Sequence, residues 1–186
     1  IVNFKPVVLF RSKTINESKE DFIEFINIVT NLSARDFNFF KKISDKVNND
    51  RSIYEQGASR TKQLINFIKT EKISLLEIIN WIKTNYKKHN IIITNSENNN
   101  LKKEKTDNNI ESLLNNLEDS DNHIRAIFTV ERLTEGWDVK NVTTIVGLRA
   151  YVAASNILPE QTLGRGLRKM LFGEEEILSV IGTQNF

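Results

Sequence analysis

Five short apolar runs constrain the fold of this sequence more than any other feature. Each run is continuous instead of alternating, which is typical of strands buried on both faces of a parallel sheet. Segments with helical spacing separate the runs, and strands that alternate with helices indicate an α/β fold with a mostly parallel sheet. The runs are KPVVLF (5–10), NIIIT (90–94), IRAIFTV (124–130), VTTIVGL (142–148) and ILSVIG (177–182).

Helical patterns fill much of the remaining chain. Residues 19–32 and 110–119 each place apolar side chains at helical spacing. Residues 33–90 predict an insertion of two or three helices, in which Ser74 and Glu77 have the spacing of a capping box. The Asn- and Lys-rich segment 95–109 predicts a flexible, solvated loop rather than a binding arm.

The segment QTLGRGLRK (161–169) predicts a helix with two unlike faces. Gln161, Arg165 and Arg168 fall on one side at 100° per residue, opposite a row of leucines. Paired guanidinium groups suit a phosphate, and the flanking Gly164 and Gly166 allow a close approach by backbone or ligand. The alternative is an ordinary surface helix whose arginines are solvated.

A second constellation is VERLTEGWDVKNV (130–142), directly after a strand run. In parallel α/β sheets, ligands bind at the carboxyl ends of the strands. Gly136 offers a permissive turn, and the Asp138 carboxylate could accept hydrogen bonds from a ribose. The alternative is a tight turn in which Asp138 bonds local amides.

Taken together, these segments resemble known motifs. LTEGWDVKNV followed by EQTLGRGLRK resembles motifs V and VI of the superfamily 2 helicases, and KPVVLFRSKT is similar to their motif IV. The segments EGWD and GRGLR are similar to the corresponding motifs of the Res (translocating) subunits of type III restriction enzymes. The resemblance runs from residue 5 to at least 169. It implies that residues 1–186 form a second RecA-like domain, a P-loop NTPase-type three-layer fold with a helical insertion.

The resemblance also implies roles for individual residues. Arg165 and Arg168 would stabilise the γ-phosphate as arginine fingers, with Gln161 beside it. Gly136 and Asp138 would form the motif V turn near the ribose. The backbone phosphates of the nucleic acid would be contacted by Arg11, Ser12, Lys13, Thr14 and Thr134.

Only half of an ATP site is expected here. No glycine is followed by lysine, so the chain lacks a phosphate-binding loop, and it lacks a DEAD-like carboxylate run for Mg²⁺. We therefore expect a piece of a longer ATP-dependent enzyme, inactive in isolation. The implied cofactors are ATP and Mg²⁺. The implied partners are DNA, duplex before single-stranded, an N-terminal RecA-like domain and a Mod-type methyltransferase subunit.

Three features depart from these motifs or carry no chemistry. The spacing of TVERLTEGWD is one residue longer than in DEAD-box proteins, which puts a nucleic-acid contact by Thr129 in doubt. Glu17-Ser18-Lys19 matches half of a nuclease motif only in letters and predicts surface charge. His89 and His123 are expected to stand apart from each other, with no carboxylate cluster nearby, so no metal site is expected.

Composition excludes some classes of protein. The absence of cysteine excludes disulfides and agrees with a cytoplasmic protein. No apolar run is long enough to span a bilayer. A net charge of +2 does not by itself indicate nucleic-acid binding. Two alternatives to the restriction translocase stay open: an RNA helicase or DNA repair or remodelling translocase of the same fold, and a non-catalytic interaction module.

Overall fold

The computed structural model describes residues 5–38, 42, 58–94, 105–130, 139–148 and 178–182. The chain forms two compact units, which we call the sheet unit and the helical unit. The sheet unit combines Ile1–Ile26 with Tyr86–Phe186, and the helical unit is Asn27–Asn85.

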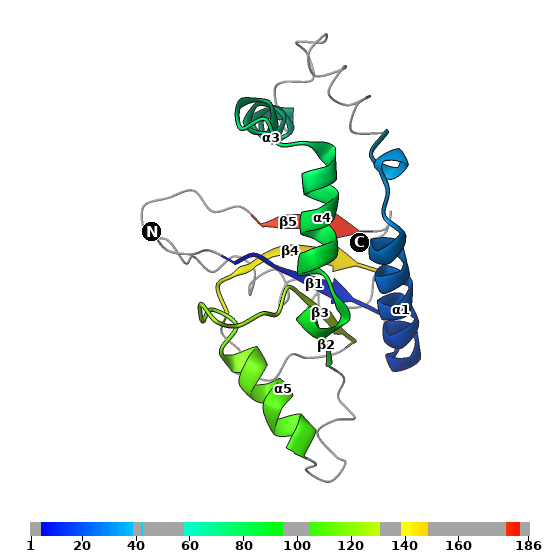
Figure 1. Ribbon diagram of the computed structural model, residues 1–186. Coiled ribbons are helices and arrows are strands. Elements are labelled where there is room, and N and C mark those ends of the chain that lie inside the picture. The colour runs from blue at the N-terminus through cyan, green and yellow to red at the C-terminus, as the bar shows by residue number, and fades with distance from the viewer. Residues whose placement is uncertain are drawn as a thin grey trace. The chain divides into compact units, whose positions relative to one another are not determined.

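The described part of the sheet unit holds five parallel strands in the order β2-β3-β1-β4-β5 (Figure 1). Each strand coincides with one of the apolar runs, which confirms the predicted α/β class. The first of these strands in sequence, β1, lies at the centre, between β3 and β4. The strands are β1 (Val7–Arg11), β2 (Ile91–Thr94), β3 (Ala126–Thr129), β4 (Val142–Gly147) and β5 (Ser179–Gly182).

Helices cover both faces of this sheet, which gives the three layers expected of a RecA-like domain. Helix α1 (Ile15–Asn31) packs Phe22 and Phe25 against Phe128 of β3. Helix α5 (Lys105–Asn115) packs Leu113 and its apolar neighbours against a second core cluster, on the opposite face of the sheet. The two clusters contain different strand residues, because alternate residues of one strand point to opposite faces.

Helix α5 begins earlier than the sequence predicts. Its first residue is Lys105, so the last five residues of the segment 95–109, expected to be a loop, are helical instead. These residues are polar and carry no apolar periodicity, yet extending an existing helix is far easier than starting one.

The side chains of two asparagines form hydrogen bonds to the backbone at the amino-terminal edge of the sheet. The buried Asn141 Nδ2 donates to the carbonyls of Lys5 (3.1 Å) and Leu117 (2.8 Å). Asn122 Nδ2 donates to the Leu113 carbonyl at 2.8 Å, at the end of α5. The ends of α5 and β1 are thereby tied to the segments that enter β3 and β4.

The helical unit contains the 3-10 helix η1 (Ala34–Phe37) and the helices α3 (Ala58–Thr70) and α4 (Leu75–Asn85). The predicted capping box is confirmed: Ser74 N donates to Glu77 Oε2 at 2.6 Å, and Glu77 N donates to Ser74 Oγ at 3.2 Å. A further 3-10 helix, η3 (Lys88–Asn90), leads into β2 in the sheet unit.

The turn between α3 and α4 is a Schellman motif. Ile73 N donates to the Ile68 carbonyl at 3.0 Å, and Lys72 N donates to the Lys69 carbonyl at 3.3 Å. Lys72 has φ 53°, the left-handed conformation in which glycine is usual. The two helices are therefore joined tightly, with a strained lysine at the corner.

Candidate functional site

The carboxyl ends of the five strands lie level across the sheet. Arg11 of β1 pairs with Thr129 of β3 on one side and with Gly147 of β4 on the other. Thr94 and Gly182 extend the row on β2 and β5. The segments that follow β1, β3 and β4 therefore leave from one edge, where parallel α/β sheets bind ligands.

The loop after β1 is anchored to both neighbouring strands. Ser12 N donates to the Thr129 carbonyl at 3.0 Å, and Leu148 N donates to the Arg11 carbonyl at 2.9 Å. The loop thus starts from a fixed position in the middle of the row.

Helix α1 begins at this edge, with Thr14 as its N-cap. Thr14 Oγ1 accepts a hydrogen bond from Glu17 N at 3.2 Å, and Ser18 N donates to the Thr14 carbonyl at 2.9 Å. The amino end of a helix carries partial positive charge and backbone donors, which favours an anion beside it. Lys13, which precedes Thr14, adds a full positive charge.

Burial divides the predicted nucleic-acid residues of this loop into two pairs. Arg11 is 3% exposed and Ser12 is fully buried, whereas Lys13 and Thr14 are exposed. The hydroxyls of Ser12 and Ser18 have no hydrogen-bond partner in the part of the chain that the structure describes. Lys13 and Thr14 are the pair that a phosphate could reach directly.

The other predicted site residues lie outside the described residues and stay predictions. After β3 the structure describes the chain as far as Val130 and again from Val139. Both valines are buried. The residues concerned are Thr134, Gly136, Asp138, Gln161, Gly164, Arg165, Gly166 and Arg168.

Thr129 is a structural residue in the sheet. It is 1% exposed, and its carbonyl holds the loop after β1. Sequence reasoning did not assign it this role, although its place at the end of an apolar run could have suggested it.

The two histidines are closer than the sequence indicates. His89 and His123 precede the neighbouring strands β2 and β3, and their ring centroids are 6.2 Å apart. The expectation that they stand apart is wrong, because strand pairing joins segments distant in sequence. Over the described ranges, no three His, Asp or Glu side chains gather as metal ligands.

Comparison with known proteins finds a similarity to a restriction-enzyme subunit. No protein-family model matches the chain. It is 55% identical over 148 residues, 80% of its length, to a probable type III restriction-modification enzyme HindVIP Res subunit of Haemophilus influenzae. This similarity supports a Res-like, helicase-related protein. The matched region is 29% of that relative, so the chain spans less than a third of its length. Within the described part of the chain, no helix is long and apolar enough to cross a membrane.

Proposed function

We propose that this chain is the second RecA-like domain of an ATP-dependent DNA translocase of the type III restriction class. The observation that carries the proposal is the 55% identity to a Res subunit. The level row of strand ends, which puts the exits of β1, β3 and β4 at one edge, supports it independently. In such an enzyme ATP is bound between this domain and an N-terminal RecA-like domain.

Arginine side chains would supply the catalytic part of this half-site. Arg165 and Arg168 would donate to the γ-phosphate, where negative charge develops during hydrolysis, and Gln161 would lie beside the attacking water. Gly136 and Asp138 would form the turn near the ribose. Gly164 and Gly166 would leave clearance for the closing domain.

Nucleic-acid binding is assigned first to the loop after β1. Lys13 and the N-cap residue Thr14 are exposed at the amino end of α1, where a DNA phosphate would meet positive charge and backbone donors. Arg11 and Ser12 are buried, so they would shape the loop, and Thr134 would contribute from the segment after β3. Such contacts are independent of sequence and weaken with salt.

The remaining components would belong to a longer protein. Mg²⁺ would neutralise phosphate charge, and its ligands would come mainly from the N-terminal domain, because this sequence has no DEAD-like carboxylate run. A Mod-type methyltransferase subunit would be a protein partner.

Arg168→Ala in the full-length protein tests the ATP half-site. We expect DNA-stimulated ATP hydrolysis to fall about 10³-fold or more, because the γ-phosphate loses a donor present only in the closed site. Binding of ATP, measured by titration with a fluorescent analogue, should stay nearly unchanged. Arg35→Ala, at an exposed arginine of the helical unit, is the matched control and should keep full activity.

Full turnover by Arg168→Ala would refute the assignment and favour a non-catalytic module. The nucleic acid that stimulates hydrolysis distinguishes a restriction translocase from an RNA helicase. Stimulation by duplex DNA above single-stranded DNA and RNA is expected for a restriction translocase, whereas stronger stimulation by RNA would indicate an RNA helicase.

A further inference from the structure

Two histidines that are distant in sequence lie close together in the sheet unit. His89 belongs to η3, which leads into β2, and His123 precedes β3. Their ring centroids are 6.2 Å apart, and both side chains are exposed to solvent. Because β2 and β3 are parallel, the pair lies at the amino ends of these strands, at the edge of the sheet opposite the level row of carboxyl ends.

The backbone beside each histidine is held by hydrogen bonds. Arg125 N donates to the Asn90 carbonyl at 2.8 Å, which extends the pairing of β2 and β3 back to the first histidine. Ile124 N donates to the Asn122 side-chain oxygen at 2.9 Å, so the residues on either side of His123 are joined. Little ordering of the backbone is therefore needed for the two imidazoles to act together.

The separation of the rings suits a shared metal ion. An imidazole nitrogen binds Zn²⁺ at about 2.0–2.1 Å, so two rings on one tetrahedral ion have centroids about 5 Å apart. The observed 6.2 Å is about 1 Å longer, a difference that small rotations of two exposed side chains remove. Two neutral imidazoles in these positions can therefore chelate one ion.

Imidazole also selects the class of ion. Its nitrogen suits Zn²⁺, Cu²⁺ and Ni²⁺, whereas Mg²⁺ takes oxygen ligands. The full sequence has two histidines and no cysteine, so these two rings are its only imidazole or thiolate ligands. A transition-metal ion that the chain binds through such ligands has to use this pair.

The formal charges near the pair in sequence cancel. Within five residues of either histidine, the chain carries three acidic and three basic side chains. The affinity for a cation must then come from the imidazoles themselves. The charged residues are Glu118, Asp119, Asp121, Lys87, Lys88 and Arg125.

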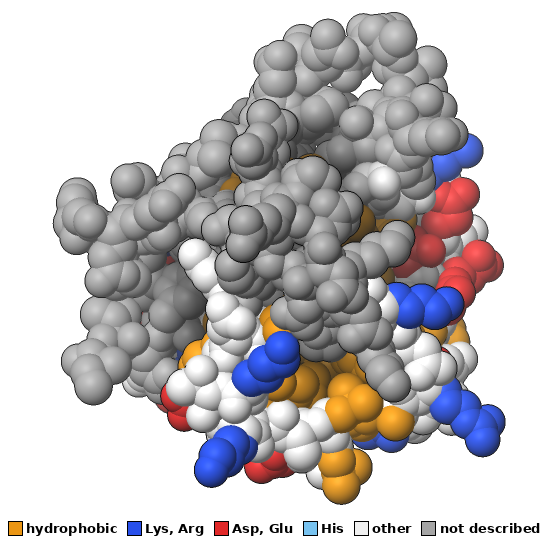
Figure 2. Space-filling model, turned by 90° about the horizontal axis from the view of Figure 1, so that it is seen from above, with side chains coloured by type: hydrophobic (Ala, Val, Ile, Leu, Met, Phe, Trp, Pro, Cys, Tyr) orange, Lys and Arg blue, Asp and Glu red, His pale blue; other side chains and the backbone are white. Residues whose placement is uncertain are grey.

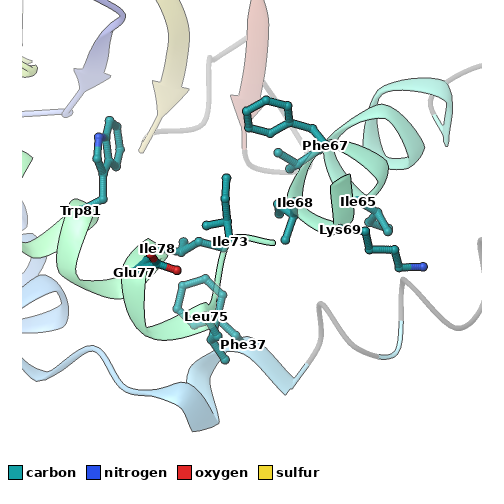
Figure 3. A pocket seen from close by; sticks show the side chains of 11 residues that line it. Phe37, Ile65, Phe67, Ile68, Lys69, Ile73, Leu75, Glu77, Ile78 and Trp81 are labelled. Carbon is teal, nitrogen blue, oxygen red and sulfur yellow. The ribbon is translucent and has the colours of Figure 1, made fainter. Parts of the chain in front are cut away.

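The apolar surfaces of the described residues do not compete for such an ion. Figure 2 shows apolar side chains reaching the described surface in patches with Lys and Arg side chains at their borders. The pocket between α3 and α4 is lined by apolar side chains apart from Lys69 and Glu77 (Figure 3). The Glu77 carboxylate accepts a hydrogen bond from Ser74 N at 2.6 Å, so it is engaged in capping α4.

We propose that His89 and His123 together bind one divalent transition-metal ion of the zinc class, with water completing its coordination. The ion would join the segments that enter β2 and β3. This site is separate from the proposed ATP half-site, and its test does not use ATPase activity, so either proposal can fail alone.

Zinc binding to the 186-residue chain tests the proposal. Titration calorimetry with ZnCl₂ should show one ion per chain, and an excess of Mg²⁺ should not displace it. Nuclear magnetic resonance of ¹⁵N-labelled imidazoles should show both histidines shifting in one titration, and the chain has no other histidine to confuse the spectrum. No binding of Zn²⁺, or a shift of one ring alone, would overturn the proposal.

Matched variants locate the ion. His89→Ala and His123→Ala should each weaken zinc binding at least about tenfold, since each removes one of two protein ligands. His123→Cys should retain binding, because a thiolate is also a zinc ligand. Lys88→Ala is the control, because Lys88 is exposed beside His89 in η3, and this variant should bind zinc at least as well as the unchanged chain. Circular dichroism of each variant verifies folding.

Three results would contradict an ion shared by the two rings. Unchanged affinity in either alanine variant of a histidine would mean that other groups hold the ion. A loss from Lys88→Ala equal to that from His89→Ala would indicate a disturbed η3 instead of a lost ligand. One ion per two chains would mean that histidines of different copies share it.

Discussion

The sheet unit and the helical unit differ in how completely they bury their apolar side chains. At the centre of the sheet unit, Phe128 is 1% exposed and its ring stacks on Phe10 with centroids 4.4 Å apart. In the helical unit, Ile65 and Ile79 are buried, whereas Phe67, two positions from Ile65 on α3, is more than half exposed. The closed core holds the strand ends in fixed positions, whereas the helical unit leaves large apolar side chains in contact with solvent.

The largest expected effect comes from truncating one phenylalanine in each unit. Phe128→Ala should lower the free energy of unfolding by about 3–5 kcal/mol, because it leaves a cavity among Phe10, Phe22 and Phe25. Phe67→Ala removes a largely exposed ring and should cost less than about 1 kcal/mol. Urea denaturation measures both. Similar losses in the free energy of unfolding for the two variants would contradict this difference between the units.

A smaller effect of opposite sign is expected at the turn of the helical unit. Lys72→Gly should stabilise this unit by up to about 1 kcal/mol, because glycine adopts φ 53° without the clash of a Cβ atom. Lys69→Gly, in the last turn of α3, should instead destabilise it by about 1 kcal/mol. Hydrogen exchange of the α3 and α4 amides reports on the helical unit alone. A change in stability of the same sign for both variants would contradict backbone strain at Lys72.

The smallest effect is a dependence on pH confined to the helical unit. Hydrogen bonds from Ser74 hold the pKa of Glu77 below its ordinary value of 4.5. Since the folded pKa is lowered, the stabilisation is present above pH 4.5 and is lost as the pH falls through the lowered pKa. Asp36, whose pKa is lowered by Ser33, adds a similar loss.

Amide exchange of α4 between about pH 5 and 3, corrected for the intrinsic exchange rate, would measure this loss. Glu77→Gln should reduce the dependence, because an amide does not titrate over this range. An unchanged profile in that variant would show that the capping carboxylate is not responsible.

The strands could be predicted because their apolar runs are continuous and bounded by polar residues. The run 5–10 became Val7–Arg11, a shift of one or two residues. The early start of α5 at Lys105 was missed because its first turn has no apolar side chain to mark a helical face. The order of the strands was not predictable either, since the pairing of β1 with β3 depends on contacts across most of the chain.

For the candidate site, the position of the loop after β1 was predictable, but the exposure of its side chains was not. The segment after β1 could be assigned to the ligand-binding edge because strands of a parallel sheet end together. Which of its side chains face solvent was not predicted: Arg11 and Ser12 are buried, whereas Lys13 and Thr14 are exposed. The apolar run before them is continuous and marks no single buried face, and an arginine at a buried position runs against the usual preference.

The central position of β1 also bears on how the chain folds during synthesis. It precedes the other described strands in sequence, yet Val8 pairs with Ala126 of β3 and Thr144 of β4. The helices of Asn27–Asn85 are complete before either partner strand exists, and they can form from local contacts. A nascent chain that stalls ahead of β3 would carry an apolar strand with both edges open, which invites aggregation. Emergence of β3 and β4 from the ribosome is therefore the step that commits the sheet to fold.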